Sequence, residues 1–167
     1  QGLNVGVIDT DFDDHHPAFA NRSLKIGRVE ASSSKSAAKT HGTGILAILA
    51  GDPRSNTPGL IPDANFYVFD IFAADETGQP VADTMSLLKA LEWMKASQVK
   101  VINMSLAGRS GSQALQDAVK YANSKGVVMV AAAGNSGGAV EFPAAYDEYV
   151  IGVGSVRYDL QRPSYSN

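Results

Sequence analysis

The 167-residue sequence contains no cysteine and only three histidines. Without cysteine there can be no disulfides, thiolate metal sites or cysteine nucleophiles, although the redox compartment stays open. The histidines are His15, His16 and His41. Any general-base chemistry by an imidazole must therefore use one of these three residues.

Net charge and long apolar runs are also scarce. Fourteen basic and seventeen acidic residues give a net charge of −3, with both signs scattered along the chain, so no nucleic-acid partner is expected. No apolar run approaches the roughly 20 residues that span a bilayer, so no membrane partner is expected either. The pattern of a signal peptide is missing too, but a mature chain would look the same, and secretion stays open.

What is present is the composition of an ordinary globular domain, with 44% apolar and 19% charged residues. A chain of this length can bury roughly 70% of its unfolded surface. Short, β-branched apolar runs predict strands covered on both faces of a parallel sheet, at residues 4–8, 65–70, 99–104, 126–132 and 149–153. Helical patterns occupy residues 41–50, 82–96 and 112–124, and loops are expected at 31–40 and 51–62. This alternation predicts the α/β fold class without an internal domain boundary.

Three of the apolar runs end in, or follow, a polar residue suited to acyl transfer. Asp9 ends the first strand, Asn135 follows the run at 127–133, and His41 precedes the helical run at 45–50. A carboxylate can orient an imidazole base and fix its tautomer, and a side-chain amide can donate to an oxyanion. Taken singly, Asp9 as a turn residue and His41 as a first-turn helix residue are equally good interpretations.

The order of the motifs resembles that of subtilisin-like serine proteases (subtilases). Val7-Ile8-Asp9-Thr10 with His16-Pro17 is similar to the family's aspartate motif, and His41-Gly42-Thr43-Gly44 with the apolar residues after it is similar to its histidine motif. Further blocks that resemble the family lie at residues 59–64, 101–106, 132–135, 142–146 and 150–155. The resemblance covers essentially the whole chain and implies a three-layer, open, mostly parallel sheet with helices on both faces.

The resemblance also implies a role for each matched position. Asp9 would orient the base, His41 would be the base, and Asn135 would donate its side-chain amide to the oxyanion. Independently of the resemblance, Gly42 and Gly44 lack side chains and would let other backbone approach the imidazole closely. The residues implied for substrate binding are a strand that pairs with the substrate backbone (Ser105, Leu106, Ala107 and Gly108) and a pocket wall (Ala132, Ala133 and Gly134).

Asp11 and the acidic residues around it depart from the family pattern, which usually has glycine two residues after the aspartate. These carboxylates could raise the basicity of His41 or attract a cation, but a solvated acidic loop is the preferred interpretation. An EF-hand is excluded, because Asp14 stands where that loop needs glycine and Ala20 where it needs glutamate. We therefore expect no cofactor and no metal site; structural calcium is left open. His15 is expected at the surface, and His16 is expected to have a structural role before Pro17.

The nucleophile is the missing part of the constellation. Ser136 lies in a Gly-x-Ser-x-Gly pattern, but residues 137–143 cannot readily form the helix that should follow such an elbow, and no histidine follows residue 41. In the family the serine lies downstream, in a Gly-Thr-Ser-x-Ala/Ser-x-Pro motif. The end of the chain, residues 163–167, is similar to the family's block before that motif. We therefore expect residues 1–167 to be a partial peptidase domain, cut at both ends.

Two functions of different classes follow from these residues. In the first, the parent polypeptide is a serine endopeptidase that acts on peptide or protein substrates through an Asp-His-Ser triad and an acyl-enzyme. In the second, the chain is a non-catalytic fragment or pseudoprotease module that at most binds extended peptides. A nucleotide-binding domain ranks far behind, because the first strand is not followed by a phosphate-binding glycine-rich turn.

The resemblance carries two further expectations. Family membership implies secretion or an extracellular location. Loss of packing from one side of the sheet is expected to expose apolar surface near the C-terminal residues, through which copies could self-associate.

Overall fold

The fold is that of a computed structural model, which describes residues 2–28 and 39–167. The chain divides into two compact units, Gln1–Lys100 and Val101–Asn167. Among the described residues, no helix is long and apolar enough to cross a membrane. Most of the predicted loop at 31–40 lies outside the described residues.

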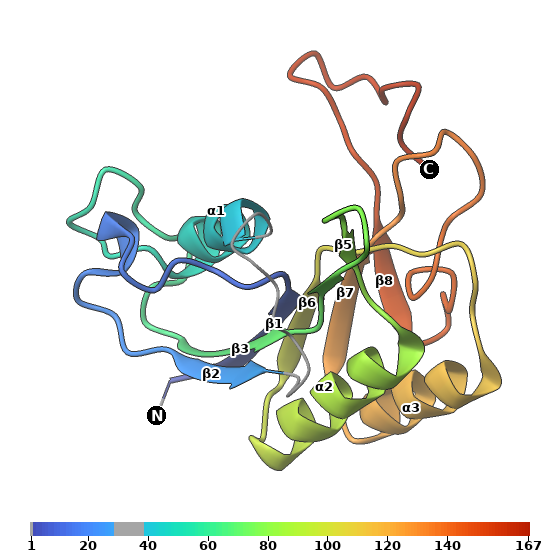
Figure 1. Cartoon of the computed structure of the whole chain (residues 1–167), viewed down its shortest axis with the longest axis horizontal. Helices are drawn as coiled ribbons and strands as arrows, with labels where there is room; N and C mark the ends of the chain where they lie inside the picture. The colour runs from blue at the N-terminus through green and yellow to red at the C-terminus, as the bar shows by residue number, and fades with distance from the viewer. Residues whose placement is uncertain (1, 29–38) are drawn as a thin grey trace. The chain divides into compact units, whose positions relative to one another are not determined.

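The first unit contains three parallel strands in the order β2-β3-β1 (Figure 1). In the pairing of β1 with β3, Asn4 lies opposite Asn65 at one end and Asp9 lies opposite Asp70 at the other. A two-stranded antiparallel ladder joins β4 to β5. The elements of this unit are β1 (Asn4–Asp9), the short helix η1 (Pro17–Phe19), β2 (Lys25–Arg28), α1 (Lys39–Ala50), β3 (Asn65–Asp70), β4 (Ala73–Ala74), β5 (Pro80–Val81) and α2 (Thr84–Ala96).

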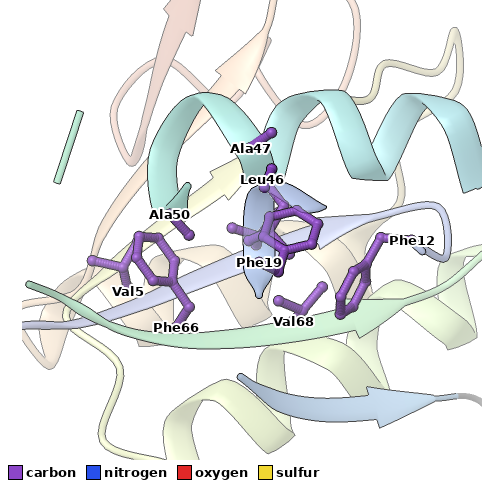
Figure 2. Packing of buried hydrophobic residues seen from close by; sticks show 10 residues of the cluster. Val5, Phe12, Phe19, Leu46, Ala47, Ala50, Phe66 and Val68 are labelled. Atoms are coloured by element: carbon purple, nitrogen blue, oxygen red, sulfur yellow. The ribbon is translucent and has the colours of Figure 1, made fainter. Parts of the chain in front are cut away.

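Alternate side chains of a strand point to opposite sides, so β1 and β3 each have two faces, and helices cover both of them. On one face, residues of both strands join the buried cluster beneath α1 shown in Figure 2. On the other face, the rings of Tyr67 and Phe69 pack against Trp93 of α2 at centroid distances of 5.9 Å and 5.4 Å. The cluster beneath α1 is made of Val5, Val7, Phe12, Ala18, Phe19, Leu46, Ala47, Ala50, Phe66 and Val68.

The second unit contains three parallel strands in the order β6-β7-β8, with α3 packed against β7. One face of these strands is buried and carries Met129 and Val150, whereas the other face carries Ile151 and Val153, which are more than half exposed. The elements are β6 (Val101–Met104), α3 (Gln113–Ser124), β7 (Val128–Ala132) and β8 (Val150–Val153).

The predicted α/β class, with mostly parallel strands and helices, is confirmed. Every predicted strand and helix is present, with ends that differ by about two residues. The strand β2 is absent from the prediction because its sequence, Lys-Ile-Gly-Arg, has no apolar run. The prediction also lacks the ladder of β4 and β5, whose strands have two residues each.

Candidate active site

Asp9 and His41 lie in direct contact. Asp9 is the last residue of β1 and continues the alternation of Val5 and Val7, so its side chain lies on the face covered by α1. His41 lies in the first turn of α1. The Asp9 Oδ1 atom is 2.6 Å from His41 Nδ1, and the side chains are 1% and 55% exposed respectively.

This contact sets the orientation of the imidazole. A carboxylate accepts, so the Nδ1–H of His41 donates to Asp9 and the Nε2 atom is left as the acceptor. The ring is half-exposed, and Nε2 can receive a proton from a group outside the core. An oriented neutral imidazole of this kind is suited to general-base catalysis.

The carboxylate itself is held in a low-dielectric setting. Burial raises the pKa of Asp9, and the hydrogen bonds from His41 and from the backbone N–H of Thr10 act in the opposite direction. The Asp9 Oδ2 atom is buried and has no hydrogen-bond partner among the described residues. The hydrogen bond to His41 therefore offsets part of the cost of burying this charge.

The loop after β1 is fastened to the start of α1 by three polar contacts. The Gly42 N–H donates to Thr10 Oγ1 at 2.9 Å, the Asp13 N–H donates to Thr43 Oγ1 at 2.9 Å, and Lys39 Nζ lies 3.2 Å from Asp11 Oδ2. These contacts fix the helix terminus that carries His41 relative to the strand end that carries Asp9. Sequence reasoning did not find them, because the hydroxyls of Thr10 and Thr43 carry no signal of their own.

Only one of the two glycines after His41 allows a close backbone approach. A methyl group built on Gly42 would lie 2.6 Å from the carbonyl oxygen of Asp11, so the approach expected there is present. Around Gly44, nothing lies within 4 Å of such a methyl group. The prediction for Gly44 is wrong, because this residue faces open space on the exposed side of α1.

A separate pocket lies in the second unit, next to Asn135. Its cavity volume is about 510 Å³. It is lined by Ser105, Leu106, Ala107, Gly108, Arg109, Ala132, Gly134, Asn135, Ser136 and Glu141. Six of the seven residues expected to bind substrate are in this lining, and Asn135 is exposed beside them.

Ala133 is the expected substrate-binding residue that does not line the pocket. It is 4% exposed, and its backbone is tied to Val153 and to Glu141 by hydrogen bonds of 2.9 Å. Gly108 lines the pocket, but its N–H and C=O are both paired with Phe142 at 2.8 Å. The part of the predicted pairing strand left for a substrate is therefore residues 105–107.

Three lining residues were missed by sequence reasoning, namely Arg109, Ser136 and Glu141. A signal for Glu141 exists in the sequence, because it is the only charged residue between Gly126 and Tyr146. An isolated acid in an apolar and glycine-rich stretch is a candidate for a specific role.

The comparison with protein families assigns all of residues 1–167 to one family, described as the subtilase family. The chain belongs to the subtilase family. It is 34% identical to subtilisin DY of Bacillus licheniformis and 32% identical to the minor extracellular protease Epr of Bacillus subtilis, with 99% of the chain covered in both cases. It spans 60% of the length of the first relative and 25% of the second.

Solved structures agree with this membership. The protease domain of PatA superimposes with a TM-score of 0.87 and 26% identity, over 99% of this chain and 62% of that domain. The prenylagaramide maturation protease PagA gives a TM-score of 0.82 and 26% identity, over 99% of this chain and 57% of the protease. The predicted subtilisin-like fold is therefore confirmed.

The acidic run that departs from the subtilase pattern is only partly solvated. Asp13 and Asp14 are exposed, as expected, but the side chain of Asp11 is 13% exposed and pairs with Lys39. The solvated-loop interpretation is therefore wrong for Asp11. Potential ligand atoms of Asp13, Asp14 and His15 lie within 4.8 Å of one another, an arrangement that exposed acidic groups commonly have without a bound ion. The expectation of no metal site stays a prediction, with structural calcium left open.

The two remaining histidines have the roles predicted for them. His15 is exposed and lies 2.8 Å from Asp14. His16 caps the short helix η1, since its Nδ1 accepts a hydrogen bond from the N–H of Ala18 at 3.2 Å.

Ser136 does not lie in a nucleophile elbow. Residues 135–139 form bends, and no helix follows them within the described part of the second unit. The Ser136 hydroxyl lies 2.8 Å from Glu141 Oε1, to which it donates, and 3.1 Å from Asn167 Oδ1. The Ser136 hydroxyl is thus paired with a carboxylate and an amide, and not with an imidazole as in a subtilase triad.

Proposed function

We propose that this chain belongs to a serine endopeptidase, to which it contributes the base His41, the orienting acid Asp9 and the oxyanion donor Asn135. The observation that carries the proposal is the 2.6 Å contact between Asp9 Oδ1 and His41 Nδ1 at the end of a buried strand. Family membership supports serine-protease chemistry in general. The three individual roles are the finer part of the proposal.

In this mechanism, His41 Nε2 removes the proton of a seryl hydroxyl while the seryl oxygen bonds to the carbonyl carbon of the substrate. The C–N bond then breaks, and His41 returns the proton to the leaving amine. Water repeats the sequence on the acyl-enzyme. Asp9 stabilises the imidazolium that forms in each half of the reaction and does not itself take the proton.

Asn135 is proposed to stabilise the negative charge that develops on the substrate carbonyl oxygen. Its side chain is exposed at the pocket, where an amide N–H can reach a ligand. Loss of such a donor lowers turnover by about 10²- to 10³-fold in subtilisin itself, which is the source of that magnitude. Residues 105–107 would pair with the substrate backbone beside it.

The seryl nucleophile is proposed to come from outside residues 1–167, since the Gly-Thr-Ser-x-Ala/Ser-x-Pro motif does not occur within them. On this proposal, residues 1–167 alone do not hydrolyse peptides at a useful rate. In subtilisin itself, loss of the nucleophile lowers turnover by about 10⁶-fold. The substrates are peptides or proteins.

An activity-based phosphonate probe directed at serine nucleophiles tests this proposal. The full translation product of the gene should be labelled at one serine beyond residue 167, and the labelling should be lost in a His41→Ala variant. Residues 1–167 alone should not be labelled. Labelling of Ser136, or a full product that is never labelled, would overturn the proposal, and the second result would favour a non-catalytic peptide-binding module.

Secretion is proposed for the same protein. The support is that the relative Epr is an extracellular protease. Recovery of the natural protein from culture medium rather than from cells would test it.

A further inference from the structure

The pocket of the second unit contains a carboxylate between two walls that consist mostly of small residues, with Leu106 and Asn135 as the larger ones. One wall is formed by residues 105–108 and the other by Ala132, Gly134 and Asn135. Glu141 joins them, and Arg109 is the other charged residue in the lining. Small walls leave room for a long side chain from a ligand.

The backbone holds Glu141 firmly in this place. Its N–H donates to the carbonyl of Ala133 at 2.9 Å, and the next residue, Phe142, pairs with Gly108 through two hydrogen bonds of 2.8 Å. Glu141 is thus fixed to the first wall through Phe142 and to the second through Ala133. A residue fixed at both walls presents its side chain with little loss of conformational entropy on binding.

The carboxylate lies against Gly134 and accepts from a neutral donor. Its Oε1 accepts from Ser136 Oγ at 2.8 Å. A methyl group built on Gly134 would lie 2.9 Å from Glu141 Cδ and 3.1 Å from Oε2, so a bare Cα is required beside the carboxyl group. The φ of Gly134 is +107°, which also favours glycine at this position.

The charge of Glu141 is not matched by a cation of the described chain. None of the ion pairs among the described residues includes Glu141. Arg109 is exposed and lines the same pocket without pairing with it. A half-buried carboxylate with a single hydroxyl donor has acceptor capacity left for the N–H groups of a ligand.

We propose that Glu141 makes this pocket selective for a lysine or arginine side chain of the peptide substrate, on the acyl side of the cleaved bond. The position follows from Asn135, which lines the same pocket and would hold the reacting carbonyl oxygen. An ammonium or guanidinium group would form a charge-assisted hydrogen bond with the carboxylate. The inference rests on the proposed function, because it assigns the substrate class of that same site.

The opposite selectivity would follow if Arg109 controlled the pocket. An exposed guanidinium there would favour acidic substrate side chains. The tighter fixation of Glu141 and its place between the walls favour the basic side chain. An Arg109→Ala variant distinguishes selectivity for basic substrate side chains from selectivity for acidic ones.

The test uses quenched fluorescent peptides that differ only in the residue on the acyl side of the cleaved bond, namely lysine, arginine, leucine or glutamate. With the full translation product, kcat/KM for lysine and arginine peptides should exceed that for leucine. Glu141→Gln should lower the lysine-to-leucine ratio by about 10- to 100-fold. Arg109→Ala and the exposed control Glu148→Gln should keep the lysine-to-leucine ratio high.

If the peptides are cleaved but Glu141→Gln leaves the lysine-to-leucine ratio unchanged, the proposed selectivity of the pocket is wrong, while the proposed endopeptidase activity stands. A preference for glutamate peptides that is lost in Arg109→Ala would also overturn it. If no peptide is cleaved, an NMR titration of residues 1–167 with acetylated tripeptides ending in lysine or leucine tests the pocket by itself. The lysine peptide should bind at least about tenfold more tightly and shift the amide signals of Gly134 and Ser136, and equal binding would overturn the inference.

Discussion

At the residue scale, the site rests on one buried carboxylate whose charge is only partly compensated. Asp9 is 1% exposed, and one of its oxygens has no hydrogen-bond partner among the described residues. Its pKa is raised because desolvation outweighs the hydrogen bonds from His41 and Thr10. Asp9 therefore holds the His41 imidazole in place at a cost in stability.

A pH titration of stability should reveal this cost. A carboxyl whose pKa is raised in the folded state binds more protons folded than unfolded, so its stabilising contribution is present at low pH and is lost as pH rises through the folded pKa. Asp9→Asn removes this dependence. The free energy of unfolding of the variant relative to the natural chain should therefore increase from about pH 4 to about pH 7.

Urea unfolding of both proteins at the two pH values measures this difference, with Asp147→Asn as an exposed control that should leave the pH dependence unchanged. If the difference in unfolding free energy between the Asp9→Asn variant and the natural chain stays constant, or decreases as pH rises, burial does not control the pKa of Asp9. Activity of the Asp9→Asn full product should fall by about 10⁴-fold, the size known for the same substitution in another Ser-His-Asp triad.

At the element scale, the start of α1 must lie close to the loop after β1. Gly42 permits this approach, since its Cα faces the backbone of Thr10 and Asp11, and its N–H is bound by the Thr10 hydroxyl. Gly44, two residues later in the same helix, faces open space. The two glycines thus form a matched pair in one helical turn.

Gly42→Ala should push α1 away from β1 and weaken the contact between Asp9 and His41, because the added methyl group would lie 2.6 Å from the Asp11 carbonyl oxygen. We expect a loss of about 1–3 kcal/mol in unfolding free energy, together with lower kcat in the full product. Gly44→Ala should instead stabilise by about 0.5–1 kcal/mol, since alanine is the better helix former. Thermal unfolding of both variants checks the pair, and equal effects would contradict the close approach at Gly42.

The elements were largely predictable from the sequence, and the reasons for the failures are physical. The strands β1, β3 and β7 are apolar runs, and α1 to α3 have helical periodicity, so local pattern and burial agree there. The strand β2 lacks such a run and forms by pairing with β3. At the site, Asp9, His41 and Asn135 lie in recognisable motifs. The contacts of Thr10 and Thr43 join residues 32 and 30 positions apart in the chain, which periodicity cannot reveal.

At the scale of the whole molecule, the second unit has an apolar strand face that the described residues leave exposed. Val128, Ile151 and Val153 are 44%, 55% and 51% exposed and lie on the same face of β7 and β8, since Val130 aligns with Ile151 and Ala132 with Val153. Val156, Tyr158 and Leu160 after β8 are more exposed still. The predicted exposure of apolar surface near the C-terminal residues is thus confirmed, and self-association through it stays a proposal.

We expect residues 1–167 to associate in a concentration-dependent manner through this strand face. Ile151→Lys should raise the dissociation constant at least about tenfold, because covering one such side chain contributes about 1.5–3 kcal/mol and a buried charge would be unpaired. Leu160→Lys is the matched control, since Leu160 is 80% exposed but lies outside the strands. Sedimentation velocity over a range of concentrations measures the association of both variants. Equal weakening by the two substitutions would indicate non-specific association, and a chain that is monomeric throughout would contradict the proposal. Selective loss of association in Ile151→Lys would assign the contact to the face formed by β7 and β8.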